Sequence, residues 1–162
     1  MHAIDDVLPT HLYKRVGSLF ESNFQNYTEH SGRYGSRILD PETIEYLQGP
    51  GKEMVCHELG SKFHPADLVL SEVWACEDNG YFEIPFHVDD VYKRISCVLY
   101  MGEGFQGTSF LDISRGEITV EPKSNRLVCF ESRGVLHRVK KNPFRRYTIQ
   151  FHYHAAPMLD DS

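Results

Sequence analysis

The sequence lacks the features that mark several specialised protein classes. Its four cysteines lie far apart and form no Cys-x-x-Cys pair, so neither a zinc knuckle nor a small disulfide framework is indicated. No stretch approaches the ~18 consecutive apolar residues of a membrane span, and the opening residues carry two acids and no apolar run. We therefore expect a soluble, cytoplasmic protein with reduced, mostly buried thiols at Cys56, Cys76, Cys97 and Cys129.

Positive charge is also in short supply. The formal net charge is −6, which disfavours a general nucleic-acid binder because contact with phosphates needs a basic face. The chain contains no internal repeat, low-complexity tract or linker, and its 162 residues suffice for one domain with a sizeable core. We expect a single domain over 1–162, with a helical part at about 1–66 and a β-rich part at about 67–155.

The first third of the chain shows apolar residues at helical spacing. The stretch from Leu12 to Phe20 predicts an amphipathic helix, with Thr10 capping its first turn. A second helix is expected after Asp40, which is followed by a first-turn proline and, further on, by a terminating Gly49. A third helix is predicted over Glu53–Leu59.

The rest of the chain breaks into short runs of β-branched and aromatic residues separated by turn-forming clusters. Eight such runs predict a mainly β fold with N-terminal helices (α+β), a jelly roll or double-stranded β-helix packed on two or three helices. The predicted strands are Leu68–Cys76, Tyr81–Phe86, Arg94–Met101, Thr108–Ile113, Glu117–Val120, Arg126–Glu131, Val135–Val139 and Arg146–His154.

Three residues that bind metals well stand out in the β-rich part. His87 and Asp89 lie two apart, so in an extended chain both side chains point to one face. His137 lies on the last-but-one predicted strand. Two histidines and one carboxylate, with other coordination positions open, are typical of non-haem Fe(II) oxygenases. The His-x-Asp pattern also arises by chance, and such a set holds other divalent ions in cupin-like proteins.

The last predicted strand adds a cation to this set. Strand alternation places Arg146, Thr148, Gln150 and His152 on one, polar face. An arginine inside a barrel suits two-pronged binding of a carboxylate, whereas a buried, unpaired arginine is costly. The alternative is a solvent-facing arginine on an edge strand, which suits Arg145 better.

These residues resemble the prolyl 4-hydroxylase-like branch of the 2-oxoglutarate- and Fe(II)-dependent dioxygenases. The resemblance covers nearly the whole chain, and the order and spacing of the metal motif match, with Arg146 nine residues after His137. Three further segments match: Ile4–Pro9 before the first helix, Tyr100–Phe105, and Glu121–Phe130 before the second histidine. A turn glycine of the family is replaced by Asn125, which tolerates the left-handed conformation.

The resemblance implies roles for individual residues. His87, Asp89 and His137 would ligate Fe(II) and carry catalysis, and the co-substrates would be 2-oxoglutarate and O2, with ascorbate as activator. The distal carboxylate of 2-oxoglutarate would pair with Arg146 and be supported by Thr148 and Tyr100. Core packing is an equal interpretation for Tyr100. Trp74 and Tyr92 are candidates for a substrate groove, although large aromatics more often pack.

The implied activity is hydroxylation of an aliphatic C–H bond with release of succinate and CO2. Asp89, where related halogenases carry Gly or Ala, favours hydroxylation over chlorination. The expected substrate is proline in a peptide or protein, and the alternative is a free amino acid or small metabolite. Nucleic-acid demethylation is disfavoured because enzymes of the alkylation-repair kind typically have a second arginine six residues beyond the first, and that position is His152 here. A cupin-like metal protein without 2-oxoglutarate turnover and a catalytically inactive binding module are the rivals from other classes.

Overall fold

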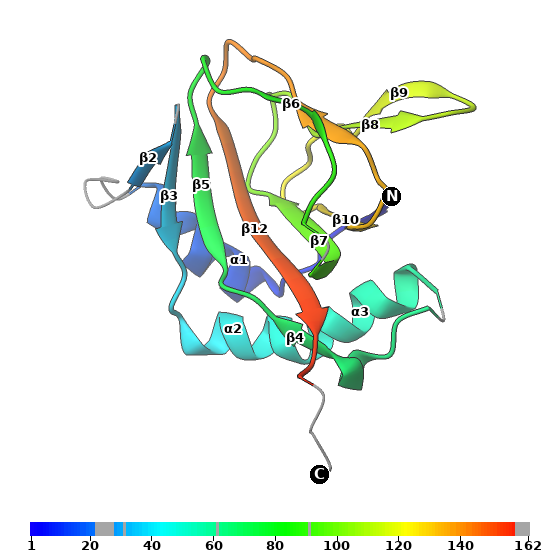
Figure 1. Ribbon diagram of the computed structural model, residues 1–162. Coiled ribbons are helices and arrows are strands. Elements are labelled where there is room, and N and C mark those ends of the chain that lie inside the picture. The colour runs from blue at the N-terminus through cyan, green and yellow to red at the C-terminus, as the bar shows by residue number, and fades with distance from the viewer. Residues whose placement is uncertain (22–27, 31, 61, 91, 158–162) are drawn as a thin grey trace.

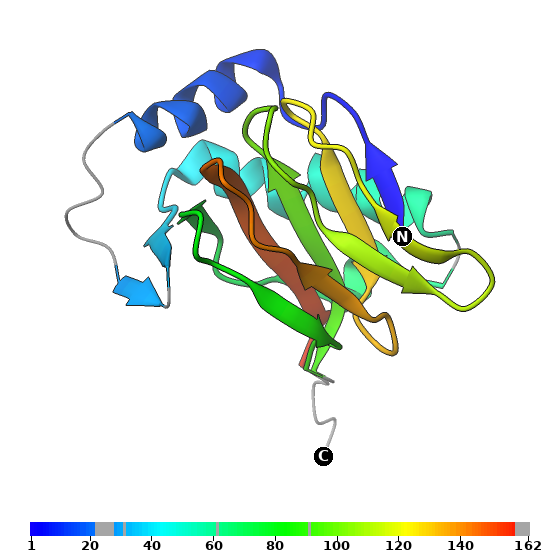
Figure 2. The ribbon, with the colours of Figure 1, turned by 90° about the horizontal axis from the view of Figure 1, so that it is seen from above.

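The computed structural model describes residues 1–21, 28–30, 32–60, 62–90 and 92–157. Three helices lie along one face of a large β-sheet, and a smaller sheet lies against the other face (Figures 1 and 2). This arrangement confirms the predicted jelly roll packed on helices. The space between the two sheets, open at one end, is the part of the fold that matters for function.

The helices are α1 (Thr10–Gly17), α2 (Pro41–Gln48) and α3 (Pro50–Glu58), with single 3-10 turns at Ser18–Phe20 and Pro65–Asp67. The start of α2 is as predicted, because the Asp40 side chain accepts a hydrogen bond from the backbone N–H of Thr43 at 3.2 Å. The predicted cap at Thr10 is wrong: Thr10 is itself helical, and Pro9 precedes it without a side-chain cap. None of the helices in the described ranges is long and apolar enough to cross a membrane.

Two antiparallel sheets contain all the strands of the described residues. The larger has the order β1-β10-β7-β12-β5-β3-β2, with β4 also pairing β12, and the smaller has the order β6-β11-β8-β9. The larger sheet comprises β1 (His2–Ile4), β2 (Thr28–His30), β3 (Arg33–Arg37), β4 (Leu68–Leu70), β5 (Trp74–Asp78), β7 (Lys93–Tyr100), β10 (Leu127–Glu131) and β12 (Arg146–Ala155). The smaller comprises β6 (Ile84–His87), β8 (Ser109–Asp112), β9 (Gly116–Thr119) and β11 (His137–Val139).

Two features of the strands differ from the prediction. The helical first part also contributes β1, β2 and β3, which extend the larger sheet at both edges. The single strand predicted over Leu68–Cys76 is two strands, both paired with β12. Between them, Ser71 donates its backbone N–H to the carbonyl of His152 and accepts the N–H of His152 on its hydroxyl, so the chain bends there without losing hydrogen bonds.

The central strand β12 separates the core from the cavity. Ile149, Phe151 and Tyr153 pack into the core that also contains the apolar faces of the helices. The Tyr153 hydroxyl donates to the carbonyl of Leu47 at 2.6 Å and so ties β12 to α2. The opposite face of β12 therefore points between the two sheets, as the alternation predicted.

Asn125 fixes the start of the helical layer on the larger sheet. Its φ of 66° is the left-handed conformation expected for a residue in a family glycine position. Its side chain accepts the backbone N–H of Leu8 at 3.0 Å and donates to the Leu8 carbonyl at 2.8 Å. The asparagine therefore supplies two buried hydrogen bonds that glycine could not make.

Candidate active site

Two histidines face each other across neighbouring strands of the smaller sheet. His87 ends β6 and His137 begins β11, and the two are direct partners in the ladder, with ring centroids 4.2 Å apart. Asp89 follows β6, and its Oδ1 lies 3.5 Å from Nε2 of His87 and 3.4 Å from Nε2 of His137. The three ligand atoms lie within 4.8 Å of one another, the one such cluster among the described residues.

The other nitrogen of each imidazole is held by the backbone. Nδ1 of His87 donates to the carbonyl of Pro85 at 2.9 Å, and Nδ1 of His137 donates to the carbonyl of Val135 at 3.0 Å. Because a carbonyl only accepts, each Nδ1 carries the proton and each Nε2 presents a lone pair. Two bare imidazole nitrogens and one carboxylate are a donor set that fits Fe(II) with open coordination positions.

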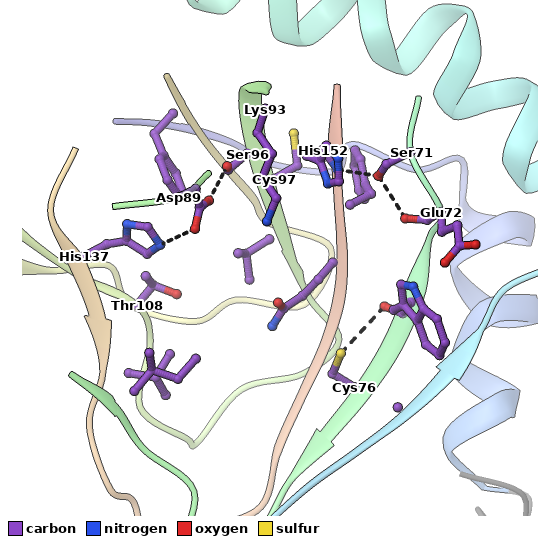
Figure 3. Close-up of a pocket in the computed structure, with 18 of the residues that line it drawn as sticks. Ser71, Glu72, Cys76, Asp89, Lys93, Ser96, Cys97, Thr108, His137 and His152 are labelled. Carbon is purple, nitrogen blue, oxygen red and sulfur yellow. Dashed lines mark hydrogen bonds and ion pairs between the residues drawn. The ribbon is translucent and has the colours of Figure 1, made fainter. Parts of the chain in front are cut away.

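Asp89 is kept ionised and oriented by hydrogen bonds. The hydroxyl of Ser96 on β7 donates to its carboxylate (Figure 3). The Ser96 hydroxyl also lies 2.7 Å from the hydroxyl of Ser132. Burial raises the pKa of Asp89, but the neighbouring His137 and the hydroxyl of Ser96 outweigh burial and hold the pKa below its usual range. The carboxylate is therefore negative and ready to bind a cation at neutral pH.

Replacing Ser96 with alanine is expected to weaken metal binding. The change removes the hydrogen bond that orients Asp89, and the loss of such a supporting partner typically costs about 10- to 100-fold in metal affinity. Isothermal titration of the metal-free protein with Fe(II) under anaerobic conditions measures this. Ser109→Ala is the matched control, since Ser109 is also buried but bonds Thr119 on the smaller sheet. Equal affinity of the Ser96 variant and the wild type would contradict the assigned role.

A cavity of about 900 Å³ opens beside the three residues. It lies between the two sheets and is lined by side chains from β5, β7 and β12 of the larger sheet and from β6 and β11 of the smaller. His87, Asp89 and His137 form part of one wall. Lys93 and His152 lie beyond Ser96 on the opposite wall (Figure 3). A metal held by the three residues would face this cavity.

Arg146 reaches the same cavity from the first position of β12. Its side chain is 2% exposed, and its Nη2 donates to the hydroxyl of Thr108 at 2.9 Å. Its Nη1 donates to the carboxylate of Asp78 at 3.1 Å, and Nε donates to the carbonyl of Gln106 at 3.2 Å. Arg146 therefore faces inward as predicted, and it has one anionic partner within the protein, Asp78, which the sequence did not predict.

No family model and no curated protein matches the sequence. Solved structures do. A prolyl 4-hydroxylase from Pseudomonas putida matches with a TM-score of 0.74 at 18% identity, over 96% of this chain and 92% of that one. A prolyl hydroxylase from Trichoplax adhaerens, in complex with a hypoxia inducible factor peptide fragment, gives 0.71 at 17% identity over 95% and 83%. A 2OG-Fe(II) oxygenase family oxidoreductase from Burkholderia pseudomallei gives 0.71 at 16% identity over 93% and 81%.

The chain has the fold of the 2-oxoglutarate- and Fe(II)-dependent oxygenases. The family resemblance found in the sequence is thereby confirmed at the level of the fold. In this oxygenase fold the cluster of His87, Asp89 and His137 lies inside the jelly roll and opens on its cavity.

Two residues assigned to the co-substrate lie outside the cavity of this oxygenase fold. Tyr100 and Thr148 are partners on β7 and β12, both 0% exposed, and neither is among the lining residues. The Tyr100 hydroxyl accepts the backbone N–H of Thr108 at 2.8 Å, and the Thr148 hydroxyl accepts from Nε2 of Gln150 at 3.1 Å. Each hydroxyl accepts one hydrogen bond within the protein and keeps its own O–H as a donor, so the assignment of both residues to the co-substrate stays a prediction.

The two aromatic candidates for substrate contact do line the cavity. Trp74, 36% exposed, lies over Gly35 of the neighbouring strand, where a Cβ would come within 3.5 Å of the indole. Tyr92, 57% exposed, meets the ring of His152 edge to face at 5.6 Å. Burial, followed by the charges of Lys93 and His154, lowers the pKa of His152 to about 4. His152 is therefore an uncharged part of the cavity wall at neutral pH.

Three residues at the site were not predicted from the sequence. Ser96 supports Asp89 across the sheets, Asp78 binds Arg146, and Arg33 of β3 also lines the cavity and binds Asp78. Serine, aspartate and arginine at these positions have no local signature. Only the pairing of β3 with β5 and of β5 with β12 brings Arg33, Asp78 and Arg146 together.

Proposed function

We propose that this protein is a 2-oxoglutarate-dependent Fe(II) oxygenase that hydroxylates an aliphatic C–H bond and releases succinate and CO2. His87, Asp89 and His137 would hold the iron, and Arg146 would bind the distal carboxylate of 2-oxoglutarate. The observation that carries the proposal is the pair of bare Nε2 atoms converging with an ionised carboxylate on a cavity that also contains a buried arginine.

Each residue has a definable part in this activity. When bound, Fe(II) and 2-oxoglutarate would supply the oxidising chemistry with O2. The backbone carbonyls behind His87 and His137 fix the rings, so both nitrogens stay aimed at one point. Asp89 contributes one negative charge and Arg146 orients the co-substrate from the far end.

For the substrate we propose proline in a peptide or protein. The exposed faces of Trp74 and Tyr92 on the cavity wall support this, since a pyrrolidine ring packs well on aromatic surfaces. The similar prolyl hydroxylase from Trichoplax adhaerens is seen with a peptide fragment, which supports it further. A free amino acid or small metabolite is the second candidate, favoured by the cationic groups Lys93 and Arg33 in the cavity.

Purified protein supplied with Fe(II), 2-oxoglutarate, O2 and ascorbate is expected to form succinate slowly even without substrate. Arg146→Met should raise the 2-oxoglutarate concentration needed for half-maximal rate steeply, because truncating one member of a buried charge pair typically costs about 2–5 kcal/mol. Arg145→Met is the matched control, since the Arg145 side chain is 66% exposed and pairs with Glu77. An effect of Arg145→Met in place of Arg146→Met would contradict the assigned orientation of β12.

The rival functions predict different results in the same assay. A cupin-like metal protein would bind the metal but form no succinate, and an inactive binding module would do neither. Stimulation of succinate formation by proline-containing peptides, compared with free amino acids and nucleotides, then identifies the substrate class. Stimulation by free amino acids alone would replace the peptide proposal with the second candidate.

A further inference from the structure

Two arginines that line the cavity, Arg146 buried and Arg33 half-buried, share a single carboxylate. Arg33 binds Asp78 through two hydrogen bonds, with Nε donating to Oδ1 at 2.6 Å and Nη2 donating to Oδ2 at 2.9 Å. Arg146 donates from Nη1 to the same Oδ2 at 3.1 Å. The side chains are 17%, 3% and 2% exposed for Arg33, Asp78 and Arg146. All three charges are therefore largely removed from water.

The charges of this cluster do not balance. Two guanidinium groups face one carboxylate, and their remaining partners are neutral: the side-chain oxygens of Gln150 and Thr108 and the carbonyl of Gln106. No other carboxylate bonds either guanidinium within the described part of the chain. An uncompensated charge in such a place is costly unless an anion joins it.

Both arginines retain capacity to bind an anion. A guanidinium has five N–H donors, and each arginine uses three of them on the partners named above, which leaves two free on each. Both side chains line the cavity that contains His87, Asp89 and His137. The Arg33 guanidinium also lies 4.2 Å from the ring centroid of Phe82, which limits its movement.

A purely structural role does not account for Arg33. Asp78 already has Arg146 as a partner, so one arginine would suffice to neutralise it. Arg33 instead creates the excess positive charge, and it does so on the wall of the cavity. We propose that Arg33 and Arg146 together bind the distal carboxylate of the co-substrate, while Asp78 holds both guanidinium groups in place. This inference rests on the proposed function.

Binding measured without turnover tests the proposal. Calorimetric titration of the Mn(II)-loaded protein under anaerobic conditions compares 2-oxoglutarate with 2-oxobutyrate, which has the same keto-acid end but lacks the distal carboxylate. Arg33→Met is expected to weaken binding of 2-oxoglutarate about 10- to 100-fold, the effect of losing a hydrogen bond to a charged group, and to leave 2-oxobutyrate unchanged. Arg33→Lys should restore part of the affinity, because lysine restores the positive charge but not the paired N–H donors of the guanidinium group.

The variants separate this inference from the proposed function. Arg33→Met should fold, because Asp78 is still paired with Arg146 and the buried charges then balance. If Arg33→Met does not fold, Arg33→Lys is compared with the wild type instead. Arg145→Met should bind as the wild type does. If Arg33→Met binds 2-oxoglutarate as the wild type does while Arg146→Met binds it more weakly, the role of Arg33 is overturned and the proposed function stands. The same holds if Arg33→Met binds 2-oxoglutarate and 2-oxobutyrate more weakly by the same factor. Failure of the Mn(II)-loaded wild type to bind 2-oxoglutarate overturns the proposed function and the inference with it.

Discussion

Replacing Asp89 with alanine is expected to abolish binding of Fe(II) and, with it, formation of succinate from 2-oxoglutarate. The change removes the one charged donor of the cluster, whose Oδ1 lies within 3.5 Å of both histidine nitrogens. The loss should exceed the about 10- to 100-fold in metal affinity expected from removing only a supporting partner. Anaerobic titration with Fe(II) and a succinate assay measure the two effects separately.

The neighbouring residue provides the control for this experiment. Asp90 carries the same charge one position further along, but it is exposed and does not belong to the cluster of His87, Asp89 and His137. Asp90→Ala should therefore bind iron and form succinate as the wild type does. Retained iron affinity in Asp89→Ala, or loss of iron binding in Asp90→Ala, would show that the ligand assignment is wrong.

Replacing Asp78 with asparagine is expected to destabilise the protein by about 3–5 kcal/mol, because it leaves buried charges without their counter-ion. Both Arg33 and Arg146 depend on this carboxylate, and its side chain is 3% exposed. Asparagine preserves the size of the side chain, so the loss reports on charge and not on packing. Urea denaturation followed by circular dichroism gives the free energy of unfolding.

Two further variants establish the cause of that loss. Glu77→Gln, at the adjacent residue, should cost at most about 1 kcal/mol, since its partner Arg145 is largely exposed and such pairs contribute little. The double variant Arg33→Met, Asp78→Asn should be more stable than the sum of its single changes implies, because one of the two unpaired charges is gone. Additive effects would mean that the arginines and Asp78 do not act as one cluster.

Local patterns were enough to predict much of this protein. The asparagine-for-glycine turn, the start of α2 and the inward face of β12 each depend on neighbours in sequence, and each is found in the structure. The grouping of His87 with Asp89 rests on the same kind of rule, since residues two apart in extended chain share a face. Their assignment as iron ligands stays a prediction until the metal is measured.

One strand prediction failed because the same apolar run can form either one strand or two. The apolar run from Leu68 to Cys76 reads as one strand, yet Ser71 bonds the backbone of His152 and divides it in two. The division depends on a partner 81 residues away, which the local pattern does not contain.

By itself, the sequence determined the jelly roll and predicted the grouping of His87, Asp89 and His137, because strand periodicity and motif spacing are properties of short segments. Only the tertiary structure decided what surrounds the trio. Asp78 binds Arg33 across 45 residues and Arg146 across 68, pairs that exist because β3, β5 and β12 lie side by side in one register. The charge environment of a cavity depends on such long-range pairing, and no local pattern encodes it.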